Sequence, residues 1–481
     1  MQGKITDMKA GELRFAAGVS RRKNTFRYDP GETNDNISVI EQPIGIFVSN
    51  NTKGSTDVSE LYGELLLPAT KKLNLELGYR YSDYDTAGGV STYKSLFDWS
   101  ATKKMRVRGG YQFASRAPNT EELFAGPRLN TVTNFIYGDP CQASTTAAWG
   151  NIASNVNRGA VQTLCRAIIG NNTSAFDTNS GSTYGPAGPN GFVRPGLPFF
   201  QAENEIPQGN PNLGVETAKT WTLGFVFNAP GHIEGLTASV DLYDIQITNV
   251  IATLNSTFVY SKCFNADGAS NPTYSINDPG GYCALITRDP TSGERSSVSA
   301  PYSNSGILKT RGVDLAANWR KDLGNNHGSF YINNLITFLD RFDIQDAASE
   351  PVLHVRDTLS TTYYGAQYKY KLNSTFGYNM HGGKASLGMS WRYLPSIHSE
   401  TAARNPATTQ TGADSYSIFN FFASYVVNDH IEFRGGIDNV LDVAPLIVEA
   451  RPGVDSNSDV TRAGYYDILG RRAYVGLKMK F

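Results

Sequence analysis

Hydrophobic and polar side chains alternate one by one in many stretches of this chain, each about ten residues long. In the clearest stretch, 73–82, the odd positions are leucine or tyrosine and the even positions are Asn, Glu, Gly, Arg and Ser. A period of two indicates a β-strand with one apolar and one polar face. We predict about fourteen such strands, near residues 12–21, 60–67, 73–82, 93–99, 105–114, 221–227, 236–250, 313–319, 330–340, 364–378, 385–394, 416–427, 431–441 and 472–481.

The connections between these strands alternate in length. Short ones fall near 68–72, 100–104, 229–235, 321–328, 380–384 and 428–430. Long ones fall near 29–57, 83–91, 115–216, 251–306, 342–360, 395–414 and 443–469. Short turns on one side and long loops on the other are typical of outer-membrane barrels, whose tilted strands have about this length. The predicted fold is all-β, a transmembrane antiparallel β-barrel with short periplasmic turns and long extracellular loops.

A soluble β-sandwich is the alternative, because its strands alternate in the same way with the apolar face turned inward. Three features oppose it. Its loops need not sort by length, and the charges here keep to one parity, as Glu432 and Arg434 do. Aromatic residues also recur near strand ends, as in an interfacial girdle, among them Tyr79, Tyr81, Trp99, Trp221 and Trp319.

Composition excludes several other classes. The 481 residues carry a net charge of −1 with 18% charged residues, which argues against a nucleic-acid partner and against a disordered tail. No apolar run approaches the ~18–20 residues of a transmembrane helix. The start, MQGKITDMKAGEL, has no apolar core of a signal peptide. We therefore expect Met1 to be an arbitrary start and the signal peptide to be absent.

Four short motifs and the chain end carry a resemblance to a known family. They are Arg116-Ala-Pro-Asn119 followed by Glu122-Leu-Phe124, Asn212-Leu-Gly-Val-Glu-Thr217, Thr310-Arg-Gly-Val-Asp-Leu315, Asp438-Asn-Val-Leu-Asp442 and the terminal Phe481. Occurring in this order, they resemble landmarks of the TonB-dependent receptors of Gram-negative outer membranes. The resemblance covers essentially the whole chain and implies a location in the cell outer membrane, surrounded by its lipid.

The resemblance also implies which parts are expected here. Large transporters of this kind have 22 strands and a plugged lumen. Because we predict only about fourteen strands, we expect residues 1–481 to be the carboxy-terminal portion of the barrel, with the plug domain absent. TonB–ExbB–ExbD would act through that missing plug segment, and the barrel assembly machinery would recognise Phe481.

The implied function is energy-coupled import of a scarce solute such as a ferric chelate, a carbohydrate or a cobalamin-like ligand. A passive porin-like channel and an outer-membrane barrel enzyme are the alternatives. The six histidines show no triad-like spacing, so we expect no enzyme and no catalytic residues. Asp455-x-Asn457-x-Asp459 lacks the glycine and final glutamate of a calcium loop, and we expect neither a metal site nor a cofactor.

The four cysteines fall in two pairs, each inside one long loop. An exported protein lies in an oxidising compartment, so we expect the disulfides Cys141–Cys165 and Cys263–Cys283. Four free thiols are the alternative. A metal site is disfavoured because no C-x-x-C spacing occurs.

Two groups of residues are candidates for ligand contact. Charges on the predicted lumen face would contact a polar ligand or the plug, or would pair with one another across strands; they are Glu76, Arg80, Arg106, Arg108, Arg116 and Glu122. Arg116 and Glu122 stand out because they lie at the lumen mouth under the longest loop. Loop residues that could stack on or hydrogen-bond to a ligand are Trp149, Phe192, Phe199, Phe200, Gln201, Asn204 and Tyr260. The alternative is that these loops only cover the barrel mouth.

Overall fold

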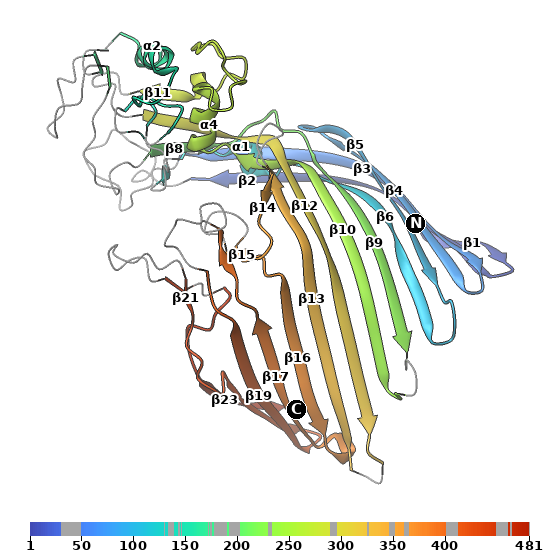
Figure 1. Cartoon of the computed structure of the whole chain (residues 1–481). Coiled ribbons are helices and arrows are strands. Elements are labelled where there is room, and N and C mark those ends of the chain that lie inside the picture. Colours follow the sequence, from blue (N-terminus) through green and yellow to red (C-terminus); the bar gives the residue numbers. More distant parts are fainter. Residues whose placement is uncertain are drawn as a thin grey trace.

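The computed structural model shows a long, curved antiparallel sheet with loop lobes gathered at one end of its strands (Figure 1). It describes residues 1–481 except 30–49, 129, 133–138, 143–144, 146, 172, 174–175, 178–189, 192–202, 229–232, 289–295, 325–326, 346–351, 360–364, 401–411, 449–459, 462–463 and 481. Among the described residues, no helix is both long and apolar enough to cross a membrane.

The wall of the sheet is a meander in which each strand pairs with the next wall strand along the chain. Its strands are β1 (Gln2–Met8), β2 (Gly11–Tyr28), β3 (Thr52–Thr70), β4 (Leu73–Tyr84), β5 (Gly88–Trp99), β6 (Met105–Arg116), β9 (Glu216–Asn228), β10 (Leu236–Thr253), β12 (Ser296–Asp322), β13 (Ser329–Gln345), β16 (Tyr370–Asn379), β17 (Ala385–Leu394), β19 (Tyr416–Asn428), β20 (Ile431–Asp438) and β23 (Arg472–Met479). The edge strands are β1 and β23, and the described residues show no pairing between these two.

All fourteen predicted strands are present, and the predicted antiparallel arrangement of the wall is confirmed. The sequence analysis missed β1, which pairs with the first residues of β2. Its register shifts between Lys4 and Thr6. Such a bulge interrupts the alternation of faces, so the segment lacks a clean period of two.

Several strands are longer than the ten residues expected, and the loops are correspondingly shorter. β3 has 19 residues and β12 has 27. The expected loop 251–306 therefore ends at Ser296, where β12 begins. Its first part, Ser-Ser-Val-Ser-Ala-Pro, is rich in small polar residues and proline, which have low β-propensity. This segment is a strand because it pairs with short strands of the long loops. The sequence pattern does not reveal such pairing.

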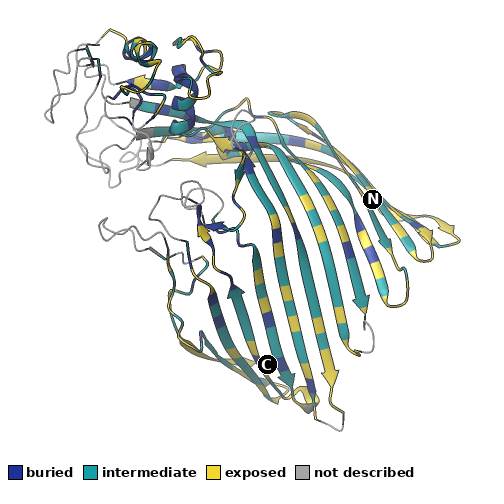
Figure 2. Cartoon of the chain, viewed as in Figure 1, coloured by how far each residue is buried: buried dark blue, intermediate teal, exposed yellow. Residues whose placement is uncertain are grey.

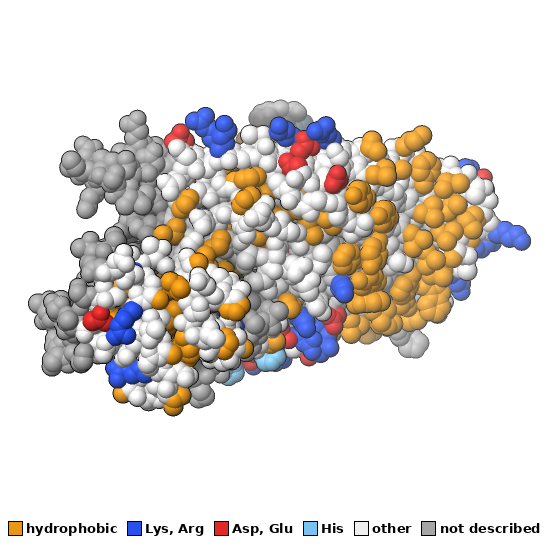
Figure 3. Space-filling view, turned by 90° about the horizontal axis from the view of Figure 1, so that it is seen from above, with side chains coloured by type: hydrophobic (Ala, Val, Ile, Leu, Met, Phe, Trp, Pro, Cys, Tyr) orange, Lys and Arg blue, Asp and Glu red, His pale blue; other side chains and the backbone are white. Residues whose placement is uncertain are grey.

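One face of the wall is apolar and rich in aromatic residues. Tyr93 lies opposite Phe113 and Tyr111 lies opposite Trp221, with ring centroids 5.3 and 4.6 Å apart. Exposed positions recur along the wall strands in Figure 2. Seen from above, apolar side chains gather over the end of the sheet where the amino-terminal strands lie (Figure 3). An exposed apolar face with aromatic clusters suits contact with lipid.

The opposite face is polar, and its charged side chains form ion pairs. The pairs include Arg80–Glu60, Lys94–Glu76, Arg106–Asp98, Arg108–Asp241 and Arg116–Glu122. Each of the six charges that the sequence analysis singled out therefore has an ion-pair partner, and of the six, Arg116 and Glu122 pair with each other. A hollow of about 690 Å³ opens on this face, and its lining includes Glu76, Arg108 and Asp314.

The long connections contain short elements of their own. They are α1 (Thr120–Phe124), β7 (Asn130–Val132), α2 (Arg158–Ile169), β8 (Glu203–Gln208), α4 (Ser256–Cys263), η2 (Cys283–Leu285), β11 (Ile286–Arg288), β14 (Leu353–His354), β15 (Thr358–Leu359), β18 (His398–Ser399), β21 (Ile447–Val448) and β22 (Val460–Thr461). The short turn after β16 holds η3 (His381–Gly383). Two of the buried clusters organise most of these elements, and we name the parts around them the first and second lobes.

The second lobe is formed by the described parts of 353–368, 394–418 and 443–466. Its core holds aliphatic residues and the buried tyrosines Tyr368, Tyr416 and Tyr466. The hydroxyl groups of Tyr368 and Tyr466 share a hydrogen bond of 2.8 Å. Because these residues come from three separate connections, the core ties the later loops together.

Asn439 fastens the end of β20 to this lobe. Its side-chain amide donates to the carbonyl of Val443 over 2.9 Å and to Asp467 over 3.2 Å, and its Oδ1 accepts from the amide of Val443 over 2.8 Å. Its φ is +48°, in the left-handed region where asparagine is tolerated better than most residues.

Replacing Asn439 with alanine should lower the free energy of unfolding by about 2–3 kcal/mol, because the buried partners of its amide lose their bonds and the backbone is strained. In Asn439→Gly the backbone is not strained, because glycine adopts this φ readily. The loss of unfolding free energy should therefore be about 1 kcal/mol smaller than in the alanine variant. Urea titration followed by heat-modifiable gel mobility measures both. Equal losses in the two variants would contradict the strain argument.

Candidate functional site

The two longest loops of the chain, 115–216 and 251–306, do not fold separately. Their apolar residues form one buried cluster, which we call the core of the first lobe. Its members from the earlier loop are Cys141, Val161, Leu164, Cys165, Ile169 and Phe176, and its members from the later loop are Val259, Tyr260, Cys263, Phe264, Cys283, Ile286 and Val298. Neither loop could bury these side chains without the other.

Both expected disulfides are present in this core. Cys141–Cys165 and Cys263–Cys283 have Cα–Cα distances of 5.8 and 4.9 Å and close segments with sequence separations of 24 and 20. A crosslink over such a segment stabilises by about 3 kcal/mol in the chain-entropy model. All four cysteines are buried, so the bonds are shielded from solvent by the joint core.

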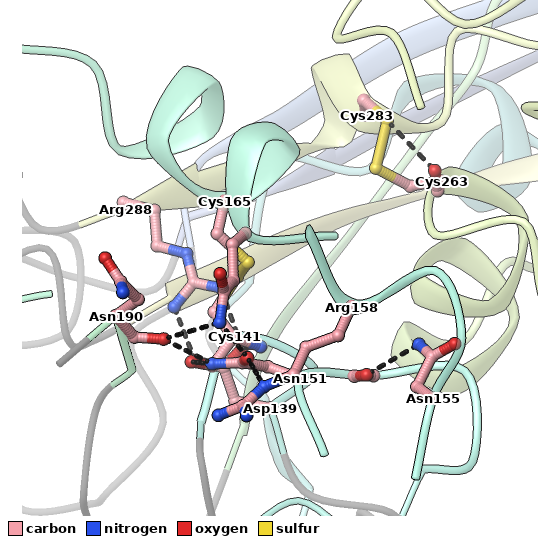
Figure 4. The surroundings of a disulfide bond; sticks show 12 residues. Asp139, Cys141, Asn151, Asn155, Arg158, Cys165, Asn190, Cys263, Cys283 and Arg288 are labelled. Atoms are coloured by element: carbon pink, nitrogen blue, oxygen red, sulfur yellow. Dashed lines mark hydrogen bonds and ion pairs between the residues drawn. A yellow bond between two sulfur atoms is a disulfide. The ribbon is translucent and has the colours of Figure 1, made fainter. Parts of the chain in front are cut away.

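A buried ion pair also joins the two loops. Arg288 of β11 donates from Nη2 to Oδ1 of Asp139 over 2.7 Å, and both side chains are almost fully buried. Figure 4 shows this pair beside the Cys141–Cys165 bond. Because Asp139 and Arg288 lie 149 residues apart, the pair forms only when both loops adopt their folded positions. Removing either partner would leave a charge buried without its counter-ion.

Asn151 completes the packing around α2. Its Nδ2 donates to the carbonyl of Asn190 over 2.8 Å, and its Oδ1 accepts from Arg158 and Gln162 over 3.0 Å each. The side chain is fully buried, and these bonds satisfy its polar atoms. It therefore positions α2 over the chain that leads to the disulfide.

The first lobe is a continuation of the barrel wall. In the wall, β12 pairs with β10 from Tyr302 onward and with β13 from Ile307 onward. In the lobe, its first residues pair with β8 and β11. At Val298 it has Ile286 of β11 on one side and Glu205 of β8, in parallel register, on the other. Backbone hydrogen bonds on both sides hold the lobe at a fixed place on the wall.

Arg116 anchors the chain where it leaves β6 and enters the lobe. Its guanidinium donates to Glu122 over 2.9 and 3.0 Å and to Glu216 over 2.7 and 2.8 Å. The side chains of Glu122 and Glu216 are only 12% and 13% exposed. One arginine thus offsets two nearly buried carboxylates, which lie on α1 and at the start of β9.

The turn between Arg116 and Glu122 is held by a capping box. Asn119 accepts from the backbone N–H of Glu122 over 2.8 Å, while the carboxylate of Glu122 accepts from the N–H of Asn119 over 2.8 Å. The reciprocal bonds satisfy two helix-end donors of α1. Phe124 then packs directly over Gly54, where a Cβ would lie 2.0 Å from its ring. Arg116 therefore joins β6 to β9 through Glu216, and Phe124 of the following helix joins them to β3 through Gly54.

The structure gives the predicted ligand-contact residues different places. Tyr260 is fully buried in the core of the first lobe, so its assignment to ligand stacking is corrected: it supports the lobe from inside. Trp149 is partly buried against the same core, with its ring 6.3 Å from that of Phe264. Asn204 lies in β8, opposite Ser297 and Thr131. Phe192, Phe199, Phe200 and Gln201 lie outside the described residues.

The sequence analysis missed Asp139, Arg288 and Lys262, which are structural charges of the first lobe. Lys262 donates to Asp267 over 2.8 Å. Burial raises the pKa of Asp267. Hydrogen bonds from Lys262, from Ser270 and from the backbone amides of Ala269 and Ser270 together lower it by more, so the net pKa lies well below its usual range. In the sequence, Asp139, Arg288 and Lys262 stand among apolar or small residues. That setting is the one signal that could have indicated that they are buried.

Within the described part of the chain, no group of three or more His, Cys, Asp and Glu side chains is arranged to hold a metal ion. What the geometry does offer is a rigid lobe joined to the mouth of a polar-faced wall. Such an arrangement presents loop surface to solvent while keeping it in register with the strands beneath.

Arg116→Ala should lower the free energy of unfolding by about 2–3 kcal/mol and expose segment 117–215 to proteinase K, because two nearly buried carboxylates lose their counter-ion. Arg108→Ala is the matched control, since the ion pair of Arg108 with Asp241 is more exposed and its loss should cost less than about 1 kcal/mol. Adding Glu122→Gln to Arg116→Ala should recover part of the loss. Equal losses for the two arginines would contradict this role.

Several solved receptors have similar folds. The ferric enterobactin receptor PfeA of Pseudomonas aeruginosa, solved with enterobactin, has 13% identity to this chain and a TM-score of 0.58. The match covers 100% of this chain and 53% of the PfeA chain. The siderophore receptor PirA of Acinetobacter baumannii has 15% identity and a TM-score of 0.56, with 100% and 54% covered. The FrpB iron transporter of Neisseria meningitidis has 11% identity and a TM-score of 0.53, with 100% and 54% covered.

The chain therefore spans about half the length of the solved receptors it matches. A search of curated proteins found no match. The family described as TonB dependent receptor-like, beta-barrel matches residues 5–440, which is most of the sequence. Together with the meander, the paired polar face and the long loops, this match decides the classification: the chain belongs to the TonB-dependent receptor β-barrel family.

Proposed function

We propose that residues 1–481 form the carboxy-terminal, ligand-capturing barrel portion of an energy-coupled importer. The family is one of non-enzymatic transporters of the Gram-negative outer membrane that couple to TonB. In the complete receptor, the TonB–ExbB–ExbD system would supply energy through a plug segment. The barrel assembly machinery would recognise the chain end at Phe481, which lies outside the described residues.

The observation that carries this proposal is the joint core of the first lobe. A loop that only covers a pore needs no buried core, whereas here two long loops are crosslinked and packed into one unit. Long loops with their own ordered structure are uncommon unless they are functional. Rigid support of this kind reduces the ordering cost of binding, which favours capture of a scarce ligand.

A ferric chelate is the ligand class that we propose first, ahead of a carbohydrate or a cobalamin-like ligand. Receptors with a similar fold are named for ferric enterobactin, siderophores and iron. At 11–15% identity their likeness to this chain is one of fold, so their ligands serve as the first probes. Capture would involve the surface of the first lobe around Trp149 and Asn204, with Arg116 and Glu122 holding the lobe in place.

Deleting residues 141–165 from the full receptor should abolish binding of the ligand while leaving a heat-modifiable barrel. The deletion removes both Cys141 and Cys165, so no unpaired thiol remains. It also removes four of the thirteen buried residues of the joint core, so the later loop should lose its fold as well. Binding is measured by titration with ferric enterobactin and ferrichrome, and with maltodextrin and cobalamin as tests of the other classes.

A milder pair of variants separates binding from folding. Trp149→Ala should weaken binding of the chelate that the wild type takes up, by roughly tenfold if the ring stacks on the ligand. Val156→Ala, at a position 95% exposed, is the control and should leave binding unchanged.

If the deleted receptor binds and imports normally, the lobe is only a cover. If the wild type binds maltodextrin or cobalamin and no chelate, the ligand class is wrong.

A further inference from the structure

The segment that follows β6 runs between the first lobe and the outer end of β3, and we call residues 120–128 the strap. It begins with α1, which lies beside the outer ends of β2 and β3 (Figure 1). The backbone N–H of Gly126 donates to Oγ1 of Thr52 over 3.0 Å. Nδ2 of Asn50 donates to the carbonyl of Pro127 over 2.9 Å. One side of the strap is therefore bonded to the start of β3.

The other side of the strap is bonded to the chain that leads from β8 to β9. The N–H of Gly209 donates to the carbonyl of Ala125 over 2.8 Å, and the N–H of Asn210 donates to the carbonyl of Glu122 over 2.9 Å. Nδ2 of Asn210 also donates to the carbonyl of Tyr302 in β12 over 2.9 Å. These bonds connect the strap to the strand that carries the first lobe.

A small buried core, separate from those of the two lobes, lies under the strap. Leu123, Leu213 and Ile251 are 1%, 2% and 8% exposed, and Phe124 and Tyr302 pack against them. These residues come from the strap, from the chain before β9, and from β10 and β12. The strap is thus held by apolar burial as well as by hydrogen bonds.

The first lobe is therefore attached to the wall at two places. One is β12, which pairs with β8 and β11, and the other is β3, which the lobe reaches through the strap. In the wall, β4, β5, β6, β9 and β10 lie between these two strands. A lobe attached at one strand could rotate about it, whereas a second attachment so far along the wall opposes this rotation.

We propose that the strap is a clamp that keeps the first lobe in one place on the wall while a ligand is captured and imported. The lobe then positions the ligand without swinging, and the strap residues are positioning residues that act through the lobe. The part of this inference that concerns ligand rests on the proposed function. The clamp itself is a property of the receptor without ligand and can be measured separately.

Gly209 offers a minimal change that weakens the clamp. A Cβ at this position would lie 2.5 Å from the backbone nitrogen of Ala125 and 2.7 Å from the carbonyl oxygen of Leu123. Since backbone atoms cannot turn aside, Gly209→Ala must push the strap away. Gly214→Ala is the matched control, because its Cβ would meet only the side chain of Asn304, at 3.8 Å.

The first test measures the place of the lobe in the full receptor. Spin labels are attached at Val156→Cys, which is 95% exposed in the lobe, and at Lys103→Cys in an exposed short turn, and their distance is measured by pulsed electron paramagnetic resonance. One narrow distance distribution is expected, unchanged by ferric enterobactin and by Gly214→Ala and broadened by Gly209→Ala. A broad distribution without ligand, or a shift when ferric enterobactin binds, would overturn the clamp.

The second test measures uptake of ferric enterobactin. Gly209→Ala should raise the half-saturating concentration roughly fivefold and leave the maximal rate unchanged, because the lobe loses its fixed place but no contact with the ligand. Phe124→Ala should act in the same way, while Phe124→Leu, which still covers Gly54, should restore most of the affinity. Heat-modifiable gel mobility confirms folding, and the Phe124 variants replace Gly209→Ala if that variant does not fold.

The outcomes separate the clamp from the proposed function. An unchanged half-saturating concentration in Gly209→Ala and Phe124→Ala, or an equal rise in Gly214→Ala, counts against the strap as a positioning element. If the wild type binds no chelate, the proposed function fails, and the distance distribution of the receptor without ligand still decides whether the clamp exists.

Discussion

The first lobe depends on one constraint: two long loops must bury apolar residues that neither can bury alone. Val161 and Leu164 of the earlier loop and Val259 and Phe264 of the later loop are all fully buried in one core. The disulfides and the Asp139–Arg288 pair lie within or beside this core, so each crosslink supports both loops. β12 belongs to both the wall and the lobe and so joins them through one strand.

The base of the lobe is fixed by electrostatics as much as by packing. Arg116 closes the gap between α1 and β9 by offsetting Glu122 and Glu216, and the capping box at Asn119 shapes the turn between them. Farther down the wall, pairs such as Arg108–Asp241 are half exposed, and each contributes little to stability. The carboxylates at Arg116 are more deeply buried than Asp241, so Arg116 is expected to contribute more to stability than the arginines below it.

The wall was predictable from sequence because alternation reports directly which side chains share a strand face. The lobe was less predictable, since contacts between loops more than a hundred residues apart leave no period in the sequence. Tyr260 shows this limit: in a polar loop an aromatic residue suggests ligand stacking, yet the partner loop buries it. The paired cysteines were predictable within each loop, but not their meeting in one core. β1 and the outer part of β12 escaped prediction because a bulge and a run of serines obscure their alternation.

The central claim is that the two loops fold as one unit, and hydrogen exchange across the loops tests it most directly. Val161→Ala removes buried volume from the earlier loop, and amide protection is then followed in α4 (Ser256–Cys263) of the later loop. A joint core predicts faster exchange in α4 as well as in α2, while Val156→Ala changes neither. Faster exchange confined to α2, with α4 protected as in the wild type, would contradict a shared core.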